Sequence, residues 1–135
     1  MSDDLCLRLQ NVNEAGVYQL TCSVTVLEAN VMLSGLTLFE VDLAPVHSKG
    51  EFLATLAQVL AAPDWFGHNW DAFSDVLGDL SWKPASGYVL LLCGGDAMLG
   101  LGEADHETVM EIFNDTVSYW KLQGKPFWVF FADGV

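Results

Sequence analysis

The chain has 135 residues, of which 52% are hydrophobic, and its 18 acidic and 5 basic side chains give a formal net charge of −13. This length and this hydrophobic content predict one folded domain with its own core, and they argue against disorder. So negative a chain repels nucleic acid and anionic membranes and attracts a basic partner, so we expect neither nucleic-acid nor membrane binding.

The N-terminal third of the chain predicts a strand, a helix and a second strand. Residues 16–22 (GVYQLTC) alternate between polar and apolar, as a half-buried strand does. Apolar residues then recur at helical spacing over 24–34, and Gly35 is a suitable C-terminal stop. Residues 36–43 (LTLFEVDL) follow as the next strand.

Two helices are predicted in the middle of the chain. Residues 48–63 form an amphipathic pattern in which Ser48 can cap the N-terminus and Glu51, three residues later, completes a capping box. Asn69 is a suitable N-cap for a second, shorter helix that runs to about residue 77.

The last third of the chain predicts a strand, a long helix and a final strand. Residues 88–94 (YVLLLCG) form a continuous apolar run, typical of a strand buried on both faces of a parallel sheet. An amphipathic helix over 106–124 and a strand over 126–133 follow. Helical connections between strands predict an α/β fold with a parallel sheet and right-handed crossovers, in a single domain over 1–135.

The N-terminus and the cysteines bear on the compartment. The chain starts with acidic residues, unlike a signal peptide, and it has no apolar run long enough to span a bilayer. Cys6, Cys22 and Cys93 are odd in number and have no CxxC spacing, so they read as reduced thiols, two of them buried. We expect a cytoplasmic protein.

Acidic residues are concentrated where basic ones are missing. There is no Lys or Arg between Lys49 and Lys83, and none between Lys83 and Lys121. Within the first gap, Asp71 and Asp75 stand four apart on a predicted helix, where like charges repel by a few tenths of a kcal/mol. The helix N-terminus favours the first carboxylate and does little for the second, a turn later.

Aromatic residues flank this acidic pair and admit two interpretations. Trp65 and Phe66 beside exposed carboxylates have the composition of a protein-binding hot spot. In the alternative, the aromatic residues with inward spacing are core side chains: Phe66, Trp70 and Phe73. For the acidic residues there is a separate explanation, that they serve solubility alone. It does not explain why the helix that carries Asp75 contains no cation.

An active site is not apparent. His68, Asp71 and Asp75 could face one side of a helix and hold a metal, but no second cluster completes a coordination shell. The two carboxylates could act as general acid and base, but a helix-surface pair offers no cleft. We therefore expect no enzyme activity, no metal and no cofactor.

The segment PDWFGHNWDAFSDVL, residues 63–77, resembles the barstar family of intracellular inhibitors of secreted ribonucleases. The family pattern is an aromatic pair, Gly, a variable residue, Asn, an apolar residue and Asp-Ala, with a second Asp four residues on. The matching residues are Trp65, Phe66, Gly67, His68, Asn69, Trp70, Asp71, Ala72 and Asp75. GEADHETVMEIF, starting at Gly102, is similar to the family's second acidic segment. The resemblance covers 36–133 and leaves 1–35 as an N-terminal extension.

This resemblance implies a barstar-like parallel sheet flanked by helices and extended by an N-terminal strand-helix unit. It implies a cytoplasmic immunity protein of a toxin–antitoxin pair, whose acidic helix enters the active site of a basic ribonuclease and mimics RNA phosphate. The partner-binding residues would be Trp65, Gly67, Asn69, Asp71, Ser74, Asp75, Glu103 and Glu107, with Asp75 as the phosphate mimic. The free protein is expected to be a monomer. The alternatives are a barstar-fold module with a non-nuclease partner, or a metal-dependent hydrolase that uses His68, Asp71 and Asp75.

Three further expectations follow. Ser74 stands where the best-known family member has an aromatic residue, so the partner is expected to be a different ribonuclease, and Trp82 is a candidate replacement for that ring. Asp115 is expected to be uninvolved in binding, so that its replacement changes binding little. The extension is expected to contribute to stability more than to binding, and to cover the sheet edge at 36–43.

Overall fold

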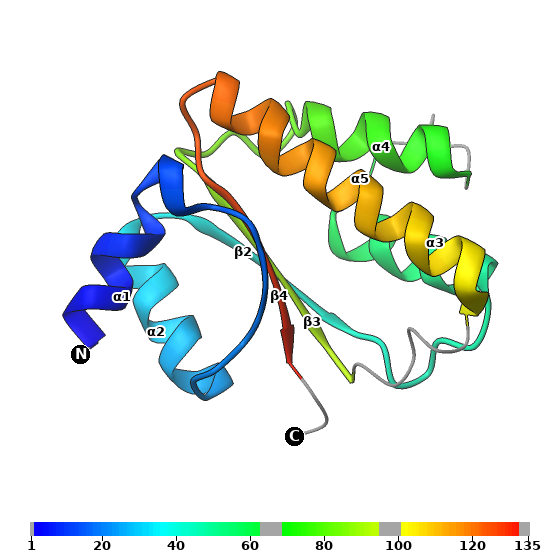
Figure 1. Ribbon diagram of the computed structural model, residues 1–135, viewed down its shortest axis with the longest axis horizontal. Helices are drawn as coiled ribbons and strands as arrows, with labels where there is room; N and C mark the ends of the chain where they lie inside the picture. Colours follow the sequence, from blue (N-terminus) through cyan, green and yellow to red (C-terminus); the bar gives the residue numbers. More distant parts are fainter. Residues whose placement is uncertain (1, 63–68, 95–100, 133–135) are drawn as a thin grey trace.

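The structure, a computed structural model, describes residues 2–62, 69–94 and 101–132, and within them four parallel strands form one sheet with helices on both faces (Figure 1). The strands are β1 (Val17–Gln19), β2 (Thr37–Asp42), β3 (Tyr88–Cys93) and β4 (Phe127–Ala132), in the spatial order β1-β4-β3-β2. The helices are α1 (Ser2–Leu9), α2 (Val24–Ser34), α3 (Lys49–Val59), α4 (Trp70–Asp79) and α5 (Gly102–Leu122), with a 3-10 turn η1 (Val12–Glu14) after α1. The predicted α/β fold, a parallel sheet flanked by helices, is confirmed.

The central strand β3 shows why the sheet needs helices on both faces. It pairs with β2 on one side and with β4 on the other, and its residues from Tyr88 to Leu92 are buried without alternation. A strand of this composition is stable only when apolar side chains cover each face. The continuous apolar run therefore correctly predicted a buried parallel strand.

Side chains of β4 show which helices cover which face. The Trp128 indole donates a hydrogen bond to the carbonyl of Leu9 in α1, at 2.9 Å. The ring of Phe131, three residues later and thus on the opposite face, contacts Phe113 of α5, with 6.2 Å between centroids. The N-terminal helices α1 and α2 form one layer and α3, α4 and α5 form the other (Figure 1).

The N-terminal extension joins the sheet at the edge opposite to β2. Val17 of β1 pairs with Val129 of β4, and the chain then crosses through α2 to β2, which is the other edge strand. The expectation that residues 1–35 cover the edge at 36–43 is therefore wrong. The crossover carries the chain past two strands, and no local pattern specifies that order.

Several local predictions are confirmed and two are wrong. Asn69 and Ser48 cap their helices through side-chain bonds, and Gly35 ends α2 in the left-handed conformation, with φ of 78°. Helix α1, by contrast, was not predicted. The three cysteines are free, but Cys22 is exposed and the other two are half-buried, so the expectation of two buried thiols is wrong. Among the described residues, no helix is long and apolar enough to cross a membrane.

Candidate protein-binding site

The first turn of α4 is fixed by its capping residue. The Asn69 side-chain oxygen accepts a hydrogen bond from the Ala72 amide at 2.8 Å, and its carbonyl accepts one from the Phe73 amide at 2.9 Å. These bonds satisfy amides that a helix N-terminus leaves without partners, and they set the position at which Asp71 emerges. Trp65 and Gly67, two predicted partner-binding residues, lie outside the described residues.

The inner face of α4 is held by aromatic packing. Phe73 is fully buried, and its ring meets Phe52 of α3 and Phe113 of α5 edge-on, with centroids 5.8 and 6.0 Å apart. Such edge-to-face pairs add to the stabilisation from burial itself. Trp70 is only half-buried. The core interpretation is thus confirmed for Phe73 and holds in part for Trp70, while Phe66 lies outside the described residues.

Two tryptophans align α4 with α5. The Trp70 indole donates to the Asp105 carboxylate at 3.3 Å, near the start of both helices. Further along, the Trp120 indole donates to the carbonyl of Leu77 at 2.8 Å. The two helices therefore run side by side in the same direction (Figure 1). With contacts at both ends, α4 presents its outer face as a rigid surface.

The outer face of α4 is acidic, and within the described residues its carboxylates form no ion pair at 4.0 Å or less. Asp71, Asp75 and Asp79 are all exposed. Across the described ranges, the ion pair found within 4.0 Å joins Arg8 and Glu14, at 3.1 Å, and involves no residue of α4. The carboxylates of α4 thus repel each other along the helix, and no ion pair within the described residues reduces this repulsion.

Three basic residues are engaged elsewhere. The Lys49 ammonium of α3 lies 5.2 Å from the centroid of the Trp70 ring, in the first turn of α4. Lys121 donates to the carbonyl of Asn13 at 3.5 Å, and Lys125 lies over the Trp120 ring at 5.8 Å.

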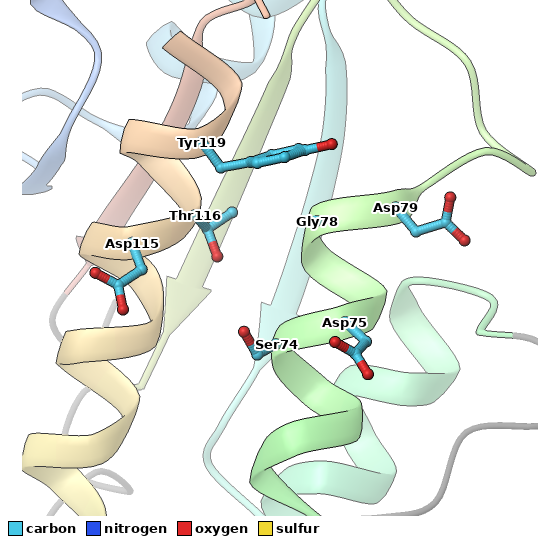
Figure 2. A pocket seen from close by; sticks show the side chains of 7 residues that line it. All are labelled: Ser74, Asp75, Gly78, Asp79, Asp115, Thr116 and Tyr119. Carbon is cyan, nitrogen blue, oxygen red and sulfur yellow. The ribbon is translucent and has the colours of Figure 1, made fainter. Parts of the chain in front are cut away.

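A groove of about 390 Å³ lies between α4 and α5 (Figure 2). Its lining residues are Ser74, Asp75, Gly78, Asp79, Asp115, Thr116 and Tyr119. The groove brings two predicted site residues, Ser74 and Asp75, together with Asp115 and Tyr119 of α5. Asp115, which is expected to take no part in binding, lines the same groove as Asp75, and its role in binding stays a prediction. The amphipathic phase of α5 could have placed Tyr119 at the border of its buried face, but no sequence pattern identifies α4 as the facing helix.

The other predicted residues do not line this groove. Glu103 and Glu107 are exposed on the first turns of α5, on either side of the Asp105 that binds Trp70. Trp82, the candidate for the missing aromatic ring, donates its indole hydrogen to the carbonyl of Leu60 at 2.9 Å. It therefore packs beside the end of α3 and does not line the groove, where the exposed ring is that of Tyr119.

A second acidic cavity, of about 620 Å³, lies at the carboxyl ends of β2 and β3. Glu40 and Asp42 line it together with Cys93. A hydrogen bond with the Glu28 side chain, assisted by burial, raises the pKa of Glu40. Burial, reinforced by the neighbouring carboxylates, raises the pKa of the Cys93 thiol, which disfavours the reactive thiolate.

The described residues offer no metal site. No group of three His, Cys, Asp or Glu side chains among them is arranged to hold an ion. His68, which the metal hypothesis requires, lies outside the described residues.

Comparison with known proteins identifies one family. The sequence model of the family described as Barstar (barnase inhibitor) matches residues 36–132. The match starts just before β2 and ends with β4, so it contains α4, α5 and the groove between them. A search of curated proteins found no match to the chain.

Proposed function

Since the chain belongs to the barstar family of barnase inhibitors, we propose that it binds a basic ribonuclease and blocks the active site of that enzyme with the acidic face of α4. In this proposal the carboxylate of Asp75 takes the place of an RNA phosphate, and Asp71 supports it one turn earlier. Ribonuclease active sites hold phosphate with cationic side chains, and carboxylates form charge-assisted hydrogen bonds with the same groups.

The observation that carries the proposal is the exposed pair Asp71 and Asp75 on α4, a helix that is held by contacts at both ends and contains no basic residue. Asp71 and Asp75 are exposed, and in the described part of the chain neither forms an ion pair within 4.0 Å. The aromatic contacts and the Asn69 cap hold both carboxylates in place before the partner arrives. Because α4 is already ordered, binding does not incur the entropy cost of folding a helix.

The remaining predicted residues have supporting roles in this proposal. Ser74 lies on the same exposed face as Asp75, and Asn69 fixes the start of the helix. Trp65 and Gly67 would contact the enzyme from the segment before α4, as the family resemblance implies. Glu103 and Glu107 would add negative charge at the start of α5, where they steer a basic enzyme toward the interface.

The biological setting belongs to the same proposal. We infer that the protein acts in the cytoplasm as the immunity partner of a nuclease toxin, that it is monomeric when free, and that it is not an enzyme. Its acidity disfavours binding to RNA itself, so inhibition arises from contact with the nuclease.

An RNA-cleavage assay tests the proposal. The full chain is titrated against barnase and against basic ribonucleases encoded by neighbouring genes. We expect stoichiometric inhibition of at least one of these enzymes, and loss of that inhibition with Asp75→Ala. Glu111→Ala is the matched control, because Glu111 is an exposed acid of α5 outside the groove. Failure to inhibit any of them, or equal inhibition by the Asp75→Ala protein, would refute the proposal; tight binding to a basic protein without nuclease activity would favour the binding-module alternative.

A further inference from the structure

We propose that a pocket between α1 and the β1–β4 side of the sheet binds a small aromatic carboxylate. The pocket encloses about 160 Å³. Most of its lining comes from residues 5–22, which precede the part of the chain that the family model matches, and the rest comes from β4. It lies in the N-terminal layer, on the face of the sheet opposite to α4 (Figure 1), so the proposal goes beyond nuclease inhibition and does not depend on it.

The size of the pocket and its aromatic wall fit one ring. An apolar cavity of about 150 Å³ is large enough to hold benzene. Trp128 and Phe130 of β4 form the wall, with ring planes 7° apart and centroids separated by 5.6 Å. The ring of Tyr18 from β1 is tilted by 35° against that of Trp128, also at 5.6 Å. A further aromatic ring gains offset or edge-on contacts with such a wall, in addition to the burial of its surface.

The polar groups of this wall are already used. The Tyr18 hydroxyl donates to the carbonyl of Glu14 at 2.6 Å, and the Trp128 indole donates to the carbonyl of Leu9 at 2.9 Å. These bonds hold both rings in place and leave their carbon faces for an occupant. The wall therefore favours an apolar ring over a polar group.

Arg8 supplies the charge that selects an acid. It lines the pocket, its side chain is 60% exposed, and it is the only basic residue before Lys49 in the sequence. Its Nε donates to the Glu14 carboxylate at 3.1 Å, and a guanidinium has four further N–H donors on its other two nitrogens. None of the described residues that line the pocket is acidic, although the chain has 18 acidic side chains. A carboxylate at the mouth would meet a cation without a competing anion in the lining.

The pocket also lies where sheets of this type bind ligands. Residues 19–22 line it at the carboxyl end of β1 and just beyond. The connection after β1 leads to α2 on one face of the sheet, whereas those after β2 and β3 lead to α3 and α5 on the other (Figure 1). In open α/β sheets, ligands bind at the carboxyl ends of strands where the connections diverge in this way.

The net charge of the chain favours a free small molecule over an acidic segment of another protein. A field from −13 charges repels an acidic polypeptide at long range, while a molecule with one carboxylate carries only a single charge against it. A basic partner would bring its cations toward Arg8. The occupant is therefore assigned as a free aromatic acid.

The test uses phenylacetate, titrated into the full chain at about 0.15 M salt and followed by amide and indole chemical shifts. We expect saturable shifts concentrated in residues 5–8, 18–22 and 128–130. Phenylacetamide, which has the same shape without the charge, should bind more weakly, and so should cyclohexylacetate, which keeps the charge without the aromatic ring. N-acetyl-phenylalanine amide, which models the side chain of a partner protein, should also bind more weakly than phenylacetate.

Two pairs of variants separate Arg8 and the pocket from charge in general. Arg8→Gln should weaken the dissociation constant for phenylacetate about two- to fivefold, as for one exposed ion pair, and should change phenylacetamide binding less, which shows that the pocket is still formed. Lys83→Gln removes an exposed charge that does not line the pocket and should have little effect. Cys22 is exposed at the pocket, so Cys22→Phe should obstruct it and reduce binding of both compounds, whereas Cys22→Ser should retain it.

The assignment is overturned if the shifts are not localised, if phenylacetamide or N-acetyl-phenylalanine amide binds as tightly as phenylacetate, or if Arg8→Gln and Lys83→Gln weaken binding alike. Ribonuclease inhibition enters none of these outcomes. A chain that inhibits a ribonuclease but does not bind phenylacetate retains the proposed function and loses the pocket. One that binds phenylacetate in the pocket without inhibiting any ribonuclease does the reverse.

Discussion

At the scale of single residues, we propose that the carboxylates of α4 serve contact with a partner rather than the stability of the helix. Asp71, Asp75 and Asp79 recur every four residues on the exposed face of α4, and the described chain offers none of them an ion pair. Like charges at this spacing cost a helix a few tenths of a kcal/mol per pair. A partner that brings its own cations would recover this cost on binding.

Gly78 provides a prediction about the stability of α4. Gly78→Ala should raise the free energy of unfolding by about 0.5 to 1 kcal/mol, because alanine restricts the unfolded chain and favours the helix. The new methyl group meets no atom within 4 Å, so no clash opposes this gain. Urea unfolding measures the change. A lower midpoint for the alanine variant would mean that Gly78 has a structural role in the helix.

Glu40 provides a prediction about pH. Its hydrogen bond with Glu28 raises its pKa in the folded protein above the ordinary value of 4.5. The folded state therefore holds this proton more tightly than the unfolded state does, so the stabilisation is fully present below the ordinary pKa and is lost as the pH rises through the raised value.

The substitution Glu40→Gln should remove this contribution. Compared with the parent chain, the variant should lose less stability between about pH 4 and about pH 7, and Glu28→Gln should have the same effect because the two carboxyls form one pair. Unfolding midpoints across this range measure the difference. Identical pH profiles for parent and variants would show that the pair does not share a proton in solution.

At the scale of elements, local sequence signals predicted the ends of helices well, but they could not predict which helices and strands pack against each other. Asn69 and Ser48 cap their helices as predicted. Capping can be predicted because the side-chain oxygen accepts a hydrogen bond from a backbone amide within the same turn. Helix α4 extends to Asp79, past the end predicted at about residue 77, because the left-handed residue is Leu80, with φ of 51°. The groove, by contrast, is lined by both Tyr119 of α5 and Ser74 of α4. Neither segment contains a sequence pattern that predicts this contact between distant parts of the chain.

The N-terminal extension provides a prediction at this scale. We propose that residues 36–133 are the inhibitory core and that 1–35 are an extension whose role is stability. Deleting 1–35 would expose the edge of β4, remove the ring of Tyr18 that packs 5.6 Å from Trp128, and leave the Trp128 indole without its bond to Leu9. An exposed apolar face and strand edge favour aggregation.

Size-exclusion chromatography of the truncated protein should therefore show aggregates, while its soluble monomeric fraction should still inhibit the ribonuclease. A truncated protein that stays folded and monomeric but does not inhibit would place the extension in the interface.

At the scale of the whole molecule, charge determines how fast a partner arrives. The net charge of the chain is −13, and α4 contains no basic residue while α5 has one, Lys121, in its last turn. Such a field attracts a basic protein over distances comparable to the Debye length, about 10 Å at 0.1 M salt.

The association rate with the inhibited ribonuclease should therefore fall steeply as salt increases from low to physiological concentration, while the dissociation rate changes much less. Stopped-flow mixing or surface plasmon resonance measures both rates. An association rate that is indifferent to salt would contradict an electrostatic interface.

Two quantities measured on Asp75→Ala show whether this carboxylate serves the partner or this chain: the midpoint of denaturant unfolding and the dissociation constant for the inhibited ribonuclease. The midpoint should be unchanged or slightly higher, because a repulsion within α4 is removed. The affinity should fall by about 3 to 5 kcal/mol, because the partner's buried cations are left without an anion. Glu111→Ala should change neither quantity appreciably. If Asp75→Ala unfolds at lower denaturant and its folded fraction binds normally, the carboxylate stabilises this chain and is not the group that binds the ribonuclease.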